Sequence, residues 1–192
     1  MKKPSVSYSP GISVSIPDGV TEIKSTVFEN CTNLTSVEIP DSVTAIGYGA
    51  FSGCSSLTSI DIPDGVSTIE RDAFGLCTSL TNMEIPESVT FMDSDVFIGC
   101  SSLTSVVLPS SITSIHSRTF CDCTSLTEID LPDGITSIES QAFANCASLT
   151  SIEIPSSVKL IDEYAFSRAG LTELVIPEGV ETIAPYAYFC TR

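Results

Sequence analysis

Acidic side chains recur at a fixed interval in this chain, and carboxylates are its most numerous groups with possible chemistry. One row, spaced by 23 residues or a multiple, contains Glu38, Asp61, Glu84, Asp130 and Glu153. Neighbouring carboxyl groups in such a row would lie near the separation of about 5 to 5.5 Å used by retaining glycosidases. Catalysis also needs two carboxyl groups in different environments and a pocket that excludes water, which a uniform row does not predict. We expect no catalytic residue and no cofactor.

The same row could instead be a contact surface. Like charges on adjacent strands destabilise a sheet, so stability alone would not select a row of acids. A row that only keeps the sheet soluble and prevents aggregation is the alternative interpretation. Calcium bridging between neighbouring carboxylates is a weaker alternative, because no loop supplies several oxygens around one ion.

Six of the eight cysteines share one position of the 23-residue interval: Cys31, Cys54, Cys77, Cys100, Cys123 and Cys146. Stacked strands lie about 4.8 Å apart with parallel side chains, whereas a disulfide needs Cβ atoms about 3.8 Å apart. This spacing predicts a row of buried free thiols. One cysteine per interval and a single histidine, His116, do not form a tetrahedral zinc site, so we expect no metal centre. Cys121 falls outside the row, and we expect it to be exposed.

Proline and phenylalanine repeat at the same interval as the cysteines. The prolines are Pro17, Pro40, Pro63, Pro86, Pro109, Pro132 and Pro155, and the phenylalanines run from Phe28 to Phe166. Three residue types with one period predict a solenoid whose units bury their apolar faces against each other. We expect a single array over 11–192 with about eight repeats, the last incomplete. Residues 1–10 contain two prolines and are expected to be an N-terminal tail or partial cap.

Each repeat predicts two extended segments and one turn. Val37 and Ile39 flank Glu38 with the period of a half-buried strand, and Pro40 ends it. We expect eight parallel copies of this strand, the first at 14–16 and the last at 174–176. Val43 and Ile46 predict a second short strand or extended turn on the opposite wall. The segment 49–54 is too short for a free helix and predicts one helical or 3₁₀ turn.

Net charge and hydropathy exclude several classes of partner. Eight Lys and Arg against 24 Asp and Glu give a formal charge of −16, which repels nucleic acids and anionic lipids. No stretch reaches the roughly 18 apolar residues of a membrane-spanning helix, so direct membrane insertion is not expected. Met1, Lys2 and Lys3 precede no apolar core, so we expect no signal peptide in this chain. Basic partners, divalent cations and neutral glycans remain candidates.

The phrases I-P-x-x-V-x-x-I and A-F-x-x-C-x-x-L resemble those of BspA-like, or Treponema pallidum-type, leucine-rich repeat proteins, over almost the whole chain. The resemblance implies a right-handed superhelix. It also implies a cell-surface or secreted protein that adheres to host matrix or to other microbes, because the family is associated with such proteins in host-associated bacteria. A fold does not determine a ligand, so this functional part rests on the family alone.

Two functions follow as hypotheses. The first is a non-enzymatic binding or adhesion module that recognises a protein or glycan, including basic ones, on a concave sheet through Glu38, Asp61, Glu84, Asp130 and Glu153. The alternative is a structural spacer or scaffold segment of a larger surface protein, without a ligand of its own. At the C-terminus Tyr188 takes the phenylalanine position and no polar cap follows. This exposed edge predicts self-association.

Overall fold

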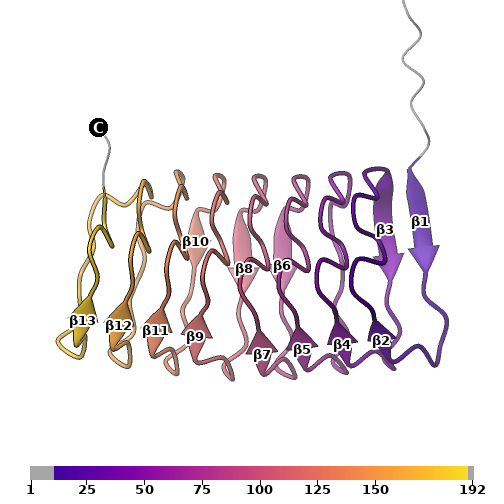
Figure 1. The fold of residues 1–192 in the computed structure, drawn as a ribbon, viewed down its shortest axis with the longest axis horizontal. Helices are drawn as coiled ribbons and strands as arrows, with labels where there is room; N and C mark the ends of the chain where they lie inside the picture. Colours follow the sequence, from indigo (N-terminus) through magenta and orange to yellow (C-terminus); the bar gives the residue numbers. More distant parts are fainter. Residues whose placement is uncertain (1–10, 190–192) are drawn as a thin grey trace, which may run out of the picture.

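The computed structural model describes residues 11–189, and they form one array of stacked turns (Figure 1). Within these residues thirteen short strands lie on two walls, and the strands pair in parallel. The parallel-strand solenoid with a 23-residue spacing is therefore confirmed. The tail or cap predicted for residues 1–10 lies outside the described residues.

The first wall contains the strands predicted around the acidic row. They are β1 (Ile12–Ser15), β3 (Leu34–Glu38), β6 (Asn82–Glu84), β8 (Ser105–Val107) and β10 (Glu128–Ile129). They form two separate sheets, β1-β3 and β6-β8-β10. Between residues 11 and 189 the copies near 57–61, 149–153 and 171–176 are not strands, so the expectation of eight strand copies is wrong.

The missing copies keep the alternation of a strand without its hydrogen-bonded ladder. Leu57, Ile60 and Ile62 are buried, and Asp61 between them is exposed. Alternation follows from burying one face, whereas a ladder also requires the neighbouring backbones to lie about 4.8 Å apart along the segment. The sequence pattern reports only the first condition.

The second wall is more continuous. Its strands are β2 (Glu22–Ile23), β4 (Ala45–Ile46), β5 (Thr68–Ile69), β7 (Phe91–Met92), β9 (Ser114–Ile115), β11 (Ser137–Ile138), β12 (Leu160–Ile161) and β13 (Thr182–Ile183). They pair as β2-β4-β5-β7 and β9-β11-β12-β13, which confirms the second short strand of each repeat. Ile46 pairs with Ile69, 23 residues on, whereas Leu160 pairs with Thr182, 22 residues on. The second wall thus keeps its pairing although this interval is one residue shorter.

The segment after each second-wall strand is a run of tight turns. In 49–54, successive backbone amides donate in turn to a carbonyl of the next turn of the array and to a carbonyl three residues earlier. Phe51 N donates to Ala73 O of the next turn (2.8 Å), and Cys54 N donates to Phe51 O (3.1 Å). Gly49 and Gly53 have φ of 57° and 74°. A 3₁₀ helix needs successive bonds within the segment and negative φ throughout. The helical or 3₁₀ turn that we expected is therefore not found in residues 11–189.

The core is a column of stacked aromatic rings in the centre of the array. Neighbouring phenylalanine rings have centroids 5.2 to 5.7 Å apart and are nearly parallel, from Phe28 to Phe166. The phenylalanines of this column from Phe51 to Phe166 are fully buried. Leu57, Leu80 and Leu103, at another position of the repeat, are fully buried as well. Because each ring packs on its equivalents, repeating one residue type builds a continuous core from units that could not bury it alone.

The cysteine row packs beside this column as free thiols, as predicted. From the second member onward each thiol donates a hydrogen bond to a phenylalanine carbonyl of the preceding turn; Cys100 Sγ lies 3.1 Å from Phe74 O. Burial raises the pKa of Cys54 to about 11 and that of Cys100 to about 12. These thiols are packing groups with one weak hydrogen bond each.

The exposure expected for Cys121 is wrong, because this residue is only 7% exposed. Its position lies between successive turns, where Ser52, Ala144 and Ser167 of other repeats are also buried. Burial raises the pKa of Cys121 to about 12, with a smaller contribution from the charge of Asp122. The row spacing alone does not reveal this second buried position.

Candidate functional site: the acidic strand face

The five predicted acids all lie on the solvent side of the first wall, a surface that we call the acidic strand face. Glu38 ends β3 and Glu84 ends β6, while Asp61, Asp130 and Glu153 occupy the same position in other repeats. Each follows a residue that points into the core, so strand alternation turns the acid outward. All five are exposed. Among residues 11–189 no Lys or Arg forms an ion pair with them.

A second row on this face carries hydrogen-bonded polar side chains. Ser36 Oγ donates to Ser13 Oγ at 2.8 Å. Asn82 Oδ1 accepts from Thr104 Oγ1 and Ser105 Oγ, each at 3.0 Å. These bonds hold Ser36, Asn82 and Ser105 in place beside the acidic row.

The face is hollowed at its middle. The hollow has a volume of about 820 Å³, spans residues 59–64, 82–88 and 105–107, and contains the carboxylates of Asp61, Asp64, Glu84 and Glu87. Val107, which pairs with Glu84 across β6 and β8, is 61% exposed at one side of it. The structure therefore brings Asp61 and Glu84 together in one concave site.

The other three predicted acids lie outside this hollow. Glu38 and Asp130 are on the same face but do not line it, and Glu153 lines a separate hollow of about 540 Å³ beside Val175 and Pro177. Sequence reasoning missed Asp64 and Glu87. Their common signal is position, because each directly follows the proline that ends the strand segment, in register with Asp18 and Asp41.

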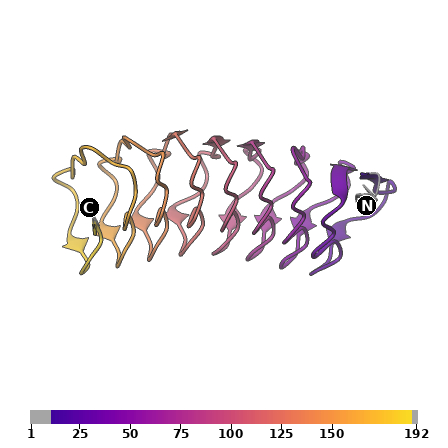
Figure 2. The same cartoon turned by 90° about the horizontal axis from the view of Figure 1, so that it is seen from above.

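The array is almost straight along its length, as Figure 2 shows, whereas the sequence predicted a concave sheet. Concavity is local, at the hollow between the repeats of Asp61 and Val107. The site can therefore admit a compact group, and the rest of the face offers a flat acidic surface.

The chemistry of the hollow is electrostatic. Four carboxylates around an open space attract cationic or hydrogen-bond-donating groups, and low-dielectric walls strengthen that attraction relative to a flat surface. In the part of the chain that the structure describes, no group of three His, Cys, Asp or Glu side chains is placed to hold a metal ion. In the same residues no helix is long and apolar enough to cross a membrane.

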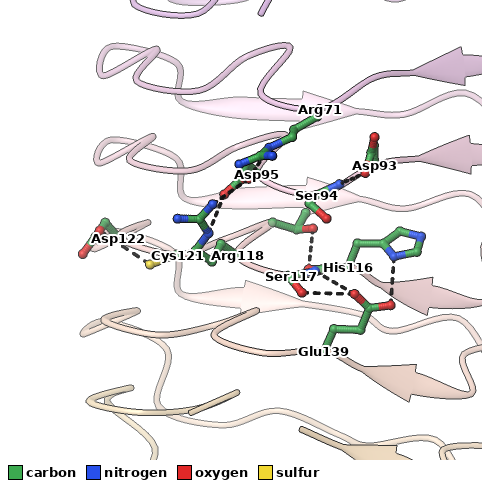
Figure 3. Close-up of polar contacts among 11 residues, drawn as sticks. Arg71, Asp93, Ser94, Asp95, His116, Ser117, Arg118, Cys121, Asp122 and Glu139 are labelled. Carbon is green, nitrogen blue, oxygen red and sulfur yellow. Dashed lines mark hydrogen bonds and ion pairs between the residues drawn. The ribbon is translucent and has the colours of Figure 1, made fainter. Parts of the chain in front are cut away.

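A separate polar cluster lies on the turn segments, outside the acidic strand face (Figure 3). His116 Nδ1 lies 2.9 Å from Glu139 Oε1, and Glu139 Oε2 accepts from Ser117 N at 3.1 Å. Beside it, Arg71 and Arg118 both contact the carboxylate of Asp95. Their near-repeat spacing of 24 and 23 residues was a signal for this contact that the sequence analysis did not use.

Comparison with known proteins agrees with this architecture. The family model of the BspA type leucine rich repeat region (6 copies) matches residues 7–127 and 92–192. A leucine-rich repeat protein from Bacteroides ovatus is 36% identical over 90% of this chain and 45% of its own, with a TM-score of 0.86. The leucine-rich repeat protein of T. pallidum is also 36% identical, over 83% of this chain and 77% of its own, with a TM-score of 0.79.

A third similar structure is a leucine rich cell surface protein from Faecalibacterium prausnitzii. It is 31% identical over 90% of this chain and 59% of its own, with a TM-score of 0.59. Among curated proteins no match is found. The chain spans less than half of the B. ovatus protein. With the repeat phrases, the parallel solenoid and these matches in agreement, the chain belongs to the BspA-type leucine-rich repeat family.

Proposed function

We propose that this chain is a non-enzymatic binding module that recognises a protein or glycan with basic or hydrogen-bond-donating groups on its acidic strand face. The observation that carries the proposal is the hollow in which Asp61, Asp64, Glu84 and Glu87 present carboxylates around one open space. No cation within residues 11–189 neutralises Asp61 or Glu84. A ligand that supplies such a cation would relieve the repulsion between neighbouring acids.

We also propose that the module acts at a cell surface, in adhesion. The F. prausnitzii relative is described as a cell surface protein, and this supports the same location here. The net charge of −16 supports basic partners and disfavours nucleic acids and anionic membranes. A cell-surface display assay with an antibody against this chain tests the location, and exclusive recovery from the cytosol would contradict it.

The binding test is a panel of matrix proteins, serum proteins and microbial glycans presented to the purified chain. The test variant changes Asp61, Glu84 and Asp130 to Lys. The matched control changes Glu22, Glu29 and Glu163 to Lys, which alters the net charge equally at exposed positions outside the acidic strand face. We expect saturable binding that the control retains and the test variant loses.

Two other outcomes have defined meanings. Equal loss in both variants would show that net charge, and not the acidic strand face, attracts the ligand. Binding by none of the three proteins would support the spacer or scaffold function, which the uniform stacking of the repeats also permits.

Self-association through the C-terminal edge is a further proposal. A mostly apolar hollow of about 330 Å³ opens there, lined by residues that include Ile161, Leu174, Ile176 and Ile183. Exposed apolar surface of this kind favours contact with a second copy. Light scattering after size-exclusion chromatography should give a dimer or larger species at about 100 μM, and Ile183→Lys should return it to monomer. A monomeric wild-type chain at that concentration would refute the proposal.

A further inference from the structure

The turn segments carry two arginines that share one buried aspartate, on an otherwise acidic protein. Residues 11–189 contain five Lys and Arg, at Lys24, Arg71, Arg118, Lys159 and Arg168. Arg71 Nε and Arg118 Nε each lie 2.8 Å from a different oxygen of Asp95, and Arg118 Nη2 donates to Asp95 Oδ2 at 3.0 Å. Two of the five cations thus converge on one carboxylate from neighbouring turns (Figure 3).

Asp95 is placed to orient these arginines. Its side chain is 5% exposed, whereas those of Arg71 and Arg118 are 54% and 39% exposed. Within residues 11–189 Asp95 Oδ1 accepts no well-aligned hydrogen bond, and its 2.8 Å contact with Arg118 Nε is an ion pair. Nη2 of the same arginine donates to the other oxygen. A buried anion that holds two exposed guanidinium groups leaves their outer N–H donors fixed in space and available.

These arginines line a hollow of about 260 Å³ with apolar neighbours. Tyr48, Leu76 and Ile98 also line it, and Tyr48 and Leu76 are 47% and 54% exposed. The carboxylates of Asp72 and Asp95 make up the rest of the wall. An exposed tyrosine ring presents a flat, electron-rich face that attracts the polarised C–H bonds on one side of a sugar ring. Arginine donors matched to a carboxylate and an aromatic face beside them are complementary to an acidic sugar.

The backbone around the hollow disfavours an extended peptide. Its amides already bond to neighbouring turns: Asp72 N donates to Ser94 O, Leu76 N to Ile98 O, and Asp95 N to Ser117 O. A peptide that adds to a protein by main-chain pairing needs a free strand edge. A compact ligand bound by side chains fits this surface better.

We propose that Arg71, Arg118 and Tyr48 form a second binding site, which takes the carboxylate and the ring face of an acidic sugar such as a uronate. This site is separate from the acidic strand face, so an experiment that refutes one binding site leaves the proposal for the other unchanged. Asp72 lines the same hollow and opposes the ligand's charge. Burial raises the pKa of Asp72, with the Ser52 hydrogen bond acting in the opposite direction.

The test is a titration of the full chain with digalacturonic acid, followed by amide chemical shifts, with neutral digalactose as the comparison. We expect saturation with a Kd on the order of 1 mM, as for a ligand with few contacts in an open hollow. Arg71→Gln should weaken binding at least fivefold, because it removes the positive charge that faces the ligand's carboxylate. Glutamine is chosen because its side-chain amide can still donate to Asp95. Tyr48→Ala should weaken it similarly, and Asp72→Asn should tighten it two- to threefold.

The matched control is Arg168→Gln, which removes an exposed arginine elsewhere on the turn segments and should leave the Kd unchanged. Circular dichroism confirms that each variant is folded. No saturable shift with about 20 mM digalacturonate, an equal response to digalactose, or equal weakening by Arg168→Gln would overturn the proposal. Acetate binding as tightly as the sugar would overturn the role of Tyr48 and the sugar ring.

Discussion

The aromatic column makes a quantitative prediction about stability. Phe97 is fully buried, and the rings of Phe74 and Phe120 stack on its two sides with centroids 5.7 Å away. Phe28 is partly buried and, among residues 11–189, stacks on the ring of Phe51 alone. Replacing a buried phenylalanine by alanine removes its transfer free energy and leaves a cavity, for a total of about 3 to 5 kcal/mol.

We expect Phe97→Ala to lower the free energy of unfolding by about 4 kcal/mol, because two stacked pairs and a fully buried ring are lost. Phe28→Ala should cost about 2 kcal/mol, since one pair and part of the burial are lost. Phe91→Ala is the matched control: Phe91 is in the same repeat as Phe97 but 45% exposed, so its cost should be within about 0.5 kcal/mol of zero.

The assay is urea unfolding followed by far-ultraviolet circular dichroism at pH 7. The dependence on urea should have the same slope for Phe28→Ala and Phe91→Ala as for the wild type, which allows their free energies to be compared. For Phe97→Ala a broader transition is expected, because a central defect weakens the coupling between the two halves of the array. A cost below about 1.5 kcal/mol for Phe97→Ala, or one equal to that of Phe28→Ala, would refute the argument that stacking between repeats supplies the stability.

Three further predictions concern the thiols and the turns. In a Cys190→Ser background the buried thiols should react with a disulfide reagent at pH 8 only after unfolding, as read by mass spectrometry of labelled peptides; fast labelling of the native protein would contradict their burial. Burial raises the pKa of Cys54 to about 11 and that of Cys100 to about 12, above the ordinary pKa of a thiol, so the unfolded chain releases protons first and the free energy of unfolding should fall as pH rises above about 9. A urea midpoint unchanged between pH 7 and pH 10 would oppose this linkage. Leu76 has a φ of 56°, and glycine occupies the equivalent position in the two neighbouring repeats, at Gly53 and Gly99. Leu76→Gly should therefore raise the free energy of unfolding by about 0.5 to 1 kcal/mol, whereas Leu76→Ala should not. Equal effects of both changes would show that the backbone is unstrained there.

Some features of this protein could be predicted from the sequence because they depend on one local condition repeated many times. Val37 and Ile39 alternate with Glu38, and Phe51 and Cys54 recur every 23 residues, so the strand faces, the aromatic column and the free thiols follow from period and apolar pattern alone. The outward direction of Glu38, Asp61, Glu84, Asp130 and Glu153 follows in the same way.

Other features depend on how one turn lies against the next. The turn at 49–54 is not helical because Phe51 N bonds to Ala73 of the following turn, an acceptor that no local propensity predicts. Leu76 and Arg118 adopt positive φ although neither residue type favours it, because the stack imposes the conformation of their glycine equivalents. Cys121 is buried because neighbouring turns of the stack pack against its side chain.

The candidate sites show the same division. Which acids share a face can be predicted from the alternation alone, because side-chain direction in a strand has a period of two. The stacking of the turns, in contrast, brings Asp64 and Glu87 to Asp61 and Glu84 around one hollow. It also brings Arg71 and Arg118 together at Asp95. A hollow and an ion pair depend on the distances between whole turns, and those distances are set by packing along the entire array rather than by any one repeat.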